Sequence, residues 1–379
     1  MLKNRLSYGA VVLVLLVFVF INDSAMTYTA FYAALILPIV SFVMGCFSKR
    51  KITLSETLSH AFTMKNEKVE YKVKIHNAGF LPCFLAYIRF DFDKIGLDAA
   101  LTEAYVSIKS FDHSEIDLQI SGKYRGIYPI GLSEWVTYDF LGIFKFKYRY
   151  ESSLALTIAP EITDLPEITS EITQLGETVV KRYMRGQDHT ISAELRAYQM
   201  TDHYKQIHWK ATAKRNELIS KNPQEIEQLS TIFFIDNLRI PTSIEQMLAR
   251  EDKFMCTLIT VLSHCHELGY RILMHDLNEK NMSLTTAFTT NFTRLYHDVA
   301  TMPFGEFGKI HHLLNDYLNN GHALENIFLF TQSIHTELIT SLRGFKLLGS
   351  HVTVFSFGKV TETNLKKLES SDIHCIQID

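Results

Sequence analysis

Two long apolar runs at the amino-terminal end constrain this chain more than any other feature of its sequence. Leu6–Ile21 is 16 residues long and Tyr28–Phe47 is 20 residues long, and neither run contains a charged side chain. As helices rising 1.5 Å per residue, they span about 24 and 30 Å, close to the ~30 Å hydrocarbon core of a bilayer. Only residues 22–27 separate them. We therefore predict that residues 1–50 form a transmembrane helical hairpin that anchors the chain.

The charges that flank this hairpin predict its orientation. Lys3 and Arg5 precede the first run, Lys49 and Arg50 follow the second, and the link carries only Asp23. Basic residues gather on the cytoplasmic side of membrane proteins, so both termini and the soluble domains are predicted to be cytoplasmic, on the cell membrane. A cleaved signal peptide followed by one stop-transfer segment would give the same orientation.

The remainder of the chain has an ordinary globular composition. Residues 1–50 hold 34 apolar residues, which leaves about 44% in the other 329. This composition excludes intrinsic disorder, a disulfide scaffold and a polytopic transporter. The formal net charge of −3 also excludes an overall basic nucleic-acid-binding protein. The five scattered cysteines are odd in number, which is typical of a reducing compartment.

Residues 51–160 follow the pattern of short β-strands. Side chains alternate between apolar and polar at 69–77 and 84–92, and again at 114–122 and within 124–140. Short strands at this spacing predict an antiparallel β-sandwich of the immunoglobulin or fibronectin type. Such a domain usually acts as a spacer or a protein-contact surface.

The pattern changes again in the carboxyl-terminal half. Residues 161–190 turn from acidic and threonine-rich to basic, and we interpret them as an interdomain connection. Within residues 191–379, buried strands are predicted at 231–236, 270–277, 325–332, 351–358 and 373–378, and helices at 243–268, 291–301, 306–319, 335–348 and 361–370. This alternation predicts an α/β domain with a mostly parallel, doubly wound sheet.

Ligands of such sheets bind beyond the carboxyl ends of the strands, where the first strand is followed by Asp236. Von Willebrand factor A domains carry a D-x-S-x-S metal motif at this place. Here Leu238 and Ile240 replace both serines, and Gln332 stands where a later aspartate ligand is expected. Aliphatic side chains cannot ligate Mg²⁺ and an amide is a poor substitute for a carboxylate. We interpret Asp236 and Gln332 as a degraded metal motif and predict no metal and no cofactor.

The most distinctive stretch is a basic segment, residues 181–221, with nine Lys or Arg and four acidic residues. It contains the run ELRAYQMTDHYKQIHWKATAKR. This run resembles the DUF58 family (domain of unknown function 58) of bacterial membrane-anchored proteins, whose pattern is approximately L-R-x-Y-x-x-G-D-x-x-R-x-I-x-W-x-x-[ST]-A-[RK]. The residues singled out here are Arg196, Tyr198, Asp202, Lys205, His208, Trp209, Lys210, Lys214 and Arg215. The run YRGIYPIG…YDFLGIF at 124–144 is also similar to a family sequence.

The resemblance implies a function as well as a layout. The family combines a membrane anchor, a β domain and a carboxyl-terminal von Willebrand A-like domain. Its members commonly accompany MoxR-type AAA+ ATPases and transglutaminase-like membrane proteins. They are thought to be non-enzymatic partners in the assembly or maturation of membrane and envelope complexes. The basic segment itself has two interpretations, an internal structural brace or a docking surface for an acidic partner.

Two other function classes stay open. The chain contains none of the common nucleotide-binding, metalloprotease or serine-hydrolase motifs, so no catalytic residue is assigned. A hydrolase would need an unrecognised site at the carboxyl edge of the sheet, near Asp236 and Gln332. A regulator could instead bind anionic lipid through the basic segment. The sequence does not indicate an oligomeric state.

Overall fold

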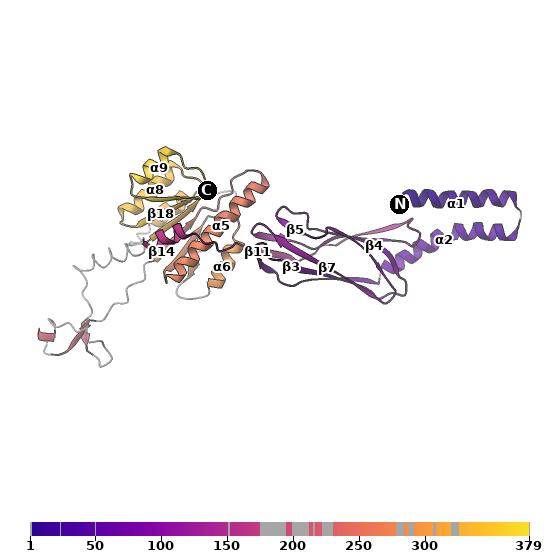
Figure 1. Ribbon diagram of the computed structural model, residues 1–379, viewed down its shortest axis with the longest axis horizontal. Coiled ribbons are helices and arrows are strands. Elements are labelled where there is room, and N and C mark those ends of the chain that lie inside the picture. The colour runs from indigo at the N-terminus through magenta and orange to yellow at the C-terminus, as the bar shows by residue number, and fades with distance from the viewer. Residues whose placement is uncertain are drawn as a thin grey trace. The chain divides into compact units, whose positions relative to one another are not determined.

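The chain folds into two units, Met1–Pro160 and Glu161–Asp379, and each is described by itself (Figure 1). The structure is a computed structural model. It describes residues 2–22, 24–49, 51–150, 152–174, 195–198, 212–214, 217–221, 230–277, 284–286, 292–305, 308–319 and 326–378.

The first unit begins with two antiparallel helices, α1 (Leu2–Ile21) and α2 (Ala25–Lys49). They lie side by side, and the Tyr8 hydroxyl donates a hydrogen bond to the Ala34 carbonyl at 2.7 Å (Figure 1). Both are long and apolar enough to cross a membrane, and they contain the two predicted runs. Pro38 lies inside α2, where proline removes a backbone donor and kinks a helix. The half of α2 that follows Pro38 turns away from α1 in Figure 1.

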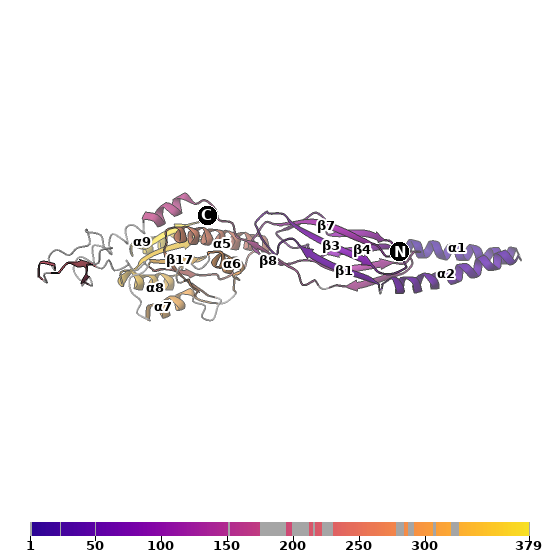
Figure 2. The ribbon, with the colours of Figure 1, turned by 90° about the horizontal axis from the view of Figure 1, so that it is seen from below.

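A β domain follows the hairpin and consists of three sheets (Figure 2). The first sheet has the order β1 (Ile52–Leu58), β3 (Val69–Asn77), β7 (His113–Gly122), β5 (Leu97–Ala99). The second has the order β10 (Lys145–Arg149), β9 (Leu132–Tyr138), β4 (Cys83–Phe90), β6 (Glu103–Ile108). The third has the order β2 (Phe62–Met64), β11 (Ala155–Ala159), β8 (Gly126–Pro129). Every pair is antiparallel except β2 with β11.

The core of this domain lies between the two four-stranded sheets. Alternate residues of β3, including Tyr71 and Ile75, are fully buried, as the period of two in the sequence predicts. Ile88 and Trp135 of the second sheet belong to the same hydrophobic cluster. The Tyr71 ring meets the Phe90 ring edge-on at 5.9 Å across the two sheets. The predicted antiparallel β-sheet domain is therefore confirmed.

The second unit contains a six-stranded sheet with the order β16 (Leu284–Thr286), β15 (Arg271–Asp276), β14 (Ser230–Ile235), β17 (Asn326–Thr331), β18 (His351–Ser356), β19 (His374–Gln377). All neighbours are parallel except β15 and β16, which are antiparallel. The chain moves outward from β14 to β16 and then returns to the other side of β14 with β17. The prediction of a mostly parallel, doubly wound sheet is confirmed, and its switch point lies between β14 and β17.

The helices of the sheet are α5 (Ile244–Glu267), α6 (Phe292–Thr301), α7 (Ile310–Asn319), α8 (Thr336–Leu347) and α9 (Glu362–Glu369). Successive side chains of β14 point to opposite faces of the sheet. On one face, the Phe233 ring and the Phe254 ring of α5 both contact the Phe330 ring. Phe234 meets Phe345 of α8 on the other face. Figure 2 shows α5 on one side of β17 and α7 and α8 on the other. Both faces of β14 are thus covered, which explains its uninterrupted apolar sequence.

The stretch predicted as an interdomain connection begins with ordered structure that belongs to the second unit. Residues 166–174 are helical, and Ile168 and Ile172 are buried. The Thr163 amide donates to the Thr260 hydroxyl of α5 at 3.0 Å. Residues 175–190 of the predicted connection lie outside the described part of the chain.

Candidate functional site at the carboxyl edge of the sheet

Asp236 lies at the switch point of the sheet, directly after β14. Its backbone amide donates to the Phe330 carbonyl at 2.8 Å, and its carboxylate accepts a hydrogen bond from the Thr331 hydroxyl at 2.6 Å. Both bonds join β14 to the end of β17. The residue is only 5% exposed. Burial raises the pKa of the Asp236 carboxyl, and hydrogen bonds from Thr331 and the Leu238 backbone oppose that rise in part.

The donor set around Asp236 does not fit a divalent cation. Leu238 and Ile240 supply no oxygen from their side chains, and the Gln332 amide nitrogen donates to the Leu238 carbonyl at 2.9 Å. Among the residues that the structure describes, no three His, Cys, Asp or Glu side chains gather into a possible metal site. Asp236 is therefore a single carboxylate, whereas Mg²⁺ demands near-octahedral coordination by oxygen ligands.

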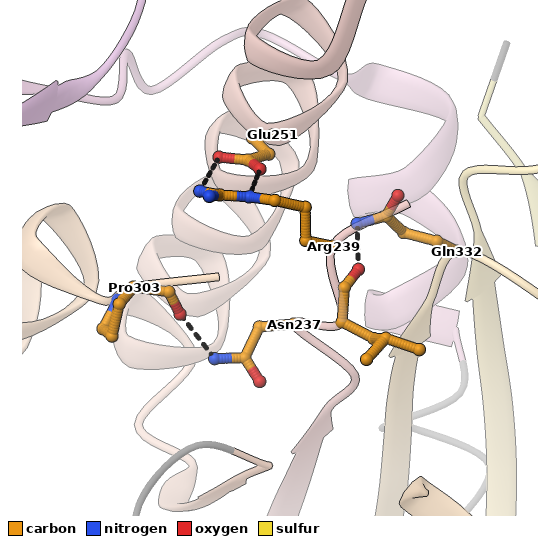
Figure 3. A network of polar contacts seen from close by, with 6 residues as sticks. Asn237, Arg239, Glu251, Pro303 and Gln332 are labelled. Atoms are coloured by element: carbon orange, nitrogen blue, oxygen red, sulfur yellow. Dashed lines mark hydrogen bonds and ion pairs between the residues drawn. The ribbon is translucent and has the colours of Figure 1, made fainter. Parts of the chain in front are cut away.

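Hydrogen bonds close the loop that follows Asp236 (Figure 3). The fully buried Asn237 side chain donates to the Pro303 carbonyl at 2.8 Å and accepts from the Leu277 amide at 3.2 Å. The backbones of Asn237 and Arg239 each bond to Gly305, at 3.0 and 2.7 Å. This loop is consequently fixed by partners from β17, from the end of β15 and from the segment after α6.

An ion pair fixes the far side of the same loop. The Arg239 guanidinium binds the Glu251 carboxylate of α5 through two nitrogens, at 2.7 and 3.4 Å (Figure 3). The Glu251 side chain is 8% exposed and the Arg239 side chain is 35% exposed. The carboxylate is therefore desolvated and depends on its partner, whereas the guanidinium keeps access to water.

An open cleft of about 680 Å³ lies beside Asp236 at this edge. Its walls come from the loop after β14, the start of α7, the β17–α8 loop, the start of α8 and α9: Asp236, Leu238, Gly308, Lys309, Ile310, His311, Ser333, Ile334, His335, Thr336, Glu337, Leu338 and Asn364. His311 pairs with Glu337 at 3.3 Å, and the Ser333 hydroxyl lies 3.1 Å from a ring nitrogen of His335. Polar and titratable side chains thus line the cleft together with buried apolar ones such as Ile310 and Leu338.

Asp236 and Gln332 were predicted at this edge from the sequence, whereas His311, His335 and Glu337 were not. A signal for His335 was present, since Ser333 and His335 follow directly after a predicted buried strand. No comparable signal marked His311, because it lies near the start of a helix far away in the sequence.

Most of the basic motif lies outside the described residues, namely Asp202, Lys205, His208, Trp209, Lys210 and Arg215. Arg196 lies in β12 (Leu195–Ala197), which pairs antiparallel with β13 (Ile219–Lys221) and places Arg196 opposite Ser220. The Tyr198 amide donates to the Leu218 carbonyl at 2.8 Å, and Lys214 is exposed. The choice between a structural brace and a docking surface stays a prediction.

His264, Cys265 and His266 of α5 are three consecutive side chains that can each ligate a metal, but they do not converge on one point. His264 lies 3.0 Å from the Thr173 hydroxyl, and the His266 ring stacks on Phe292. Cys265 is fully buried between them, and burial raises the pKa of its thiol. All five cysteines of the chain are free.

No known family model and no curated protein matches this chain. Among solved structures, it is similar to the CARDB domain of the PF1109 protein from Pyrococcus furiosus, with 12% identity, a TM-score of 0.20, and coverage of 28% of this chain and 91% of that one. It is also similar to the cupredoxin domain of amoB from Nitrosocaldus yellowstonii, with 8% identity, a TM-score of 0.21, and coverage of 32% and 98%. Scores this low assign neither a family nor a function.

Proposed function

We propose that this protein is a non-enzymatic, membrane-anchored scaffold of the DUF58 type. Its hairpin holds it in the cell membrane, its immunoglobulin-like β domain is a spacer, and its carboxyl-terminal domain binds protein partners in the cytoplasm. The partner class is a MoxR-type AAA+ ATPase, with a transglutaminase-like membrane protein as a further candidate. The process served is the assembly or maturation of membrane or envelope complexes.

The strand order supports the von Willebrand A-like part of this proposal. The sheet runs 3-2-1-4-5-6 in order of appearance, with a short antiparallel third strand at its edge. An aspartate follows the first strand at the switch point, the place where such domains bind their ligands. The charges around the hairpin support the cytoplasmic orientation.

The main support for a binding role is that the hydrogen-bonded loop after Asp236 lies beside an open cleft. The loop at Asp236 is held by internal hydrogen bonds and lacks the donors for a cation. Next to it, His335 and Glu337 are exposed at the rim of the cleft. A surface that is already fixed loses little conformational entropy when a partner binds. We infer that the carboxyl edge binds its partner without a metal ion.

A crosslinked purification from native membranes tests this proposal. The full chain, crosslinked in the presence of nucleotide, should recover an AAA+ ATPase. The charge reversal Glu337→Lys should reduce that recovery strongly. Glu369→Lys is the matched control, because Glu369 is an exposed glutamate at the opposite, amino edge of the sheet. Equal recovery with both variants would refute the assignment of the carboxyl edge, and recovery of no ATPase would refute the partner class.

A hydrolase is the second candidate, and the pair formed by Ser333 and His335 favours it. Their separation of 3.1 Å is within the range for a nucleophile and its general base. The Asp236 carboxylate interacts electrostatically with His335, but among the described residues only Ser333 is hydrogen-bonded to the His335 ring, so the constellation is incomplete. A fluorophosphonate probe that labels the native protein but not Ser333→Ala would support this candidate, and absence of labelling would count against it.

A further inference from the structure

The last two turns of α2 pack against the β domain of the same unit. Ser41 is fully buried, and its hydroxyl donates a hydrogen bond to the Asp139 carboxylate. The Phe42 ring meets the Phe144 ring edge-on at 5.2 Å. Gly45 lies directly against the Phe146 ring, so that a Cβ atom there would collide with it. This part of the second apolar run therefore serves protein packing.

The start of α1 contacts the same loop of the β domain. The Arg5 guanidinium donates to the Ile143 carbonyl at 2.9 Å. A buried aspartate and an arginine consequently both contact this loop, and such charged groups are costly inside the hydrocarbon of a bilayer, so we take the level of Ser41 as its edge. The stretches left to cross it are residues 6–21 and 25–40, each about 24 Å long as a helix. This is shorter than the usual ~30 Å core, so the β domain must approach the bilayer closely.

Exposed phenylalanines gather on the loops and on the start of β4 at this end of the β domain. We call Phe80, Phe84, Phe111 and Phe140 the aromatic collar, and their exposed fractions are 79%, 50%, 67% and 39%. The Phe84 and Phe140 rings lie 6.1 Å apart. The Phe111 amide donates to the Gly79 carbonyl at 3.2 Å, next to Phe80.

The collar is joined directly to the end of the hairpin. Lys51, two residues beyond α2, accepts a hydrogen bond from the Ala78 amide at 2.9 Å through its carbonyl. Phe84 and Phe140 line a small cavity together with Met44 and Gly45 of α2. The collar thus surrounds the point where the anchor meets the β domain. Soluble proteins rarely expose clustered large apolar side chains without a binding role.

Phe111 adds a backbone observation. Its φ angle is +53°, in the left-handed region that a bulky side chain seldom adopts. The Phe111 ring is thus presented to the surface from a strained turn. Exposed lysines at 51, 109 and 145 accompany the collar. Aromatic rings with nearby basic groups are the composition that membrane interfaces favour.

We propose that the aromatic collar is embedded in the interfacial region of the bilayer that the hairpin crosses. The β domain then stands on the membrane surface, and its orientation is set by lipid contact as well as by the helices. The proposal rests on the hairpin being a membrane anchor. It adds a second, peripheral lipid contact that the hairpin alone does not require.

Tryptophan substitutions in the full chain test the collar. Phe84→Trp and Phe111→Trp are conservative changes at exposed rings. The matched control is Ile95→Trp, because Ile95 is 50% exposed and follows the opposite end of β4. Eight residues of strand separate that end from the collar by about 26 Å. Each variant is reconstituted into vesicles of phosphatidylcholine and phosphatidylglycerol, with or without brominated acyl chains.

The collar tryptophans should show blue-shifted emission, and brominated lipid should quench most of the emission that they add to the parent spectrum. Ile95→Trp should show neither change. Collar variants that behave like Ile95→Trp would overturn the proposal. Alkaline carbonate extraction of the same vesicles distinguishes failure of the collar proposal from failure of the proposed hairpin anchor. Protein that is retained but unquenched overturns the collar alone, whereas released protein overturns the hairpin anchor and the collar with it.

Discussion

The ion pair between Arg239 and Glu251 predicts an asymmetric response to substitution. Arg239→Met keeps the aliphatic stem but removes the charge, and leaves a carboxylate that is 8% exposed without its partner. Removing one member of a buried pair costs about 3–5 kcal/mol, and the partial exposure of the arginine places this case near 3 kcal/mol. Glu251→Gln leaves a guanidinium that is 35% exposed and can hydrate. That change should cost only about 1 kcal/mol.

Amide hydrogen exchange of the full chain measures the difference in cost between the two variants at the loop after β14. The Arg239 and Gly305 amides close the loop after β14, so their exchange reports its opening. Arg239→Met should raise the opening equilibrium constant about a hundredfold, and Glu251→Gln about fivefold. The double variant should open less readily than Arg239→Met alone, because it no longer buries an unpaired carboxylate.

Two results would refute this reasoning. Equal costs for the two single variants would mean that burial of Glu251 does not determine the energy of the pair. Strictly additive effects in the double variant would mean that the two charges are not coupled, despite their contact at 2.7 Å.

Three further predictions concern the same edge. Gly358→Ala should destabilise the domain by about 1–3 kcal/mol, because a Cβ atom at 358 meets the Gln332 carbonyl. The same collision should weaken the hydrogen bond from the Gln332 side chain to the Leu238 carbonyl. Thermal unfolding measures the loss of stability, and amide hydrogen exchange at 236–239 measures the weakened bond. The pKa of Asp236 is raised in the folded state, so its contribution to the free energy of unfolding falls as pH rises above the ordinary aspartate value of 3.8. Asp236→Asn should therefore gain stability relative to the parent as pH rises and lose that advantage in acid. Denaturant titrations at several pH values that show no such trend would contradict the raised pKa of Asp236. Mg²⁺ and EDTA should leave the melting temperature and partner recovery unchanged, and a clear shift with Mg²⁺ would contradict the absence of cation ligands.

The sequence by itself determined the two helices of the hairpin, several strands of the β domain, and most strands and helices of the α/β domain. The apolar runs of α1 and α2 need no partner segment to be recognised, because the length of an uncharged helix is a local property. The strands β14 and β17 were evident as short apolar runs, because both of their faces are covered. The rule that ligands bind beyond such strands also located Asp236 correctly at the edge between them.

Only the tertiary structure decided which side chains meet. The edge strand β16 is three residues long, too short to carry a pattern of its own. His311 joins Glu337 because α7 and α8 pack on the same face of the sheet, and no local period encodes that contact. The sequence likewise assigned all of Tyr28–Phe47 to one apolar run, yet its end packs on the β domain through Ser41. Hydropathy records how apolar a segment is, whereas the choice between lipid and protein as its surroundings depends on the domain that folds beside it.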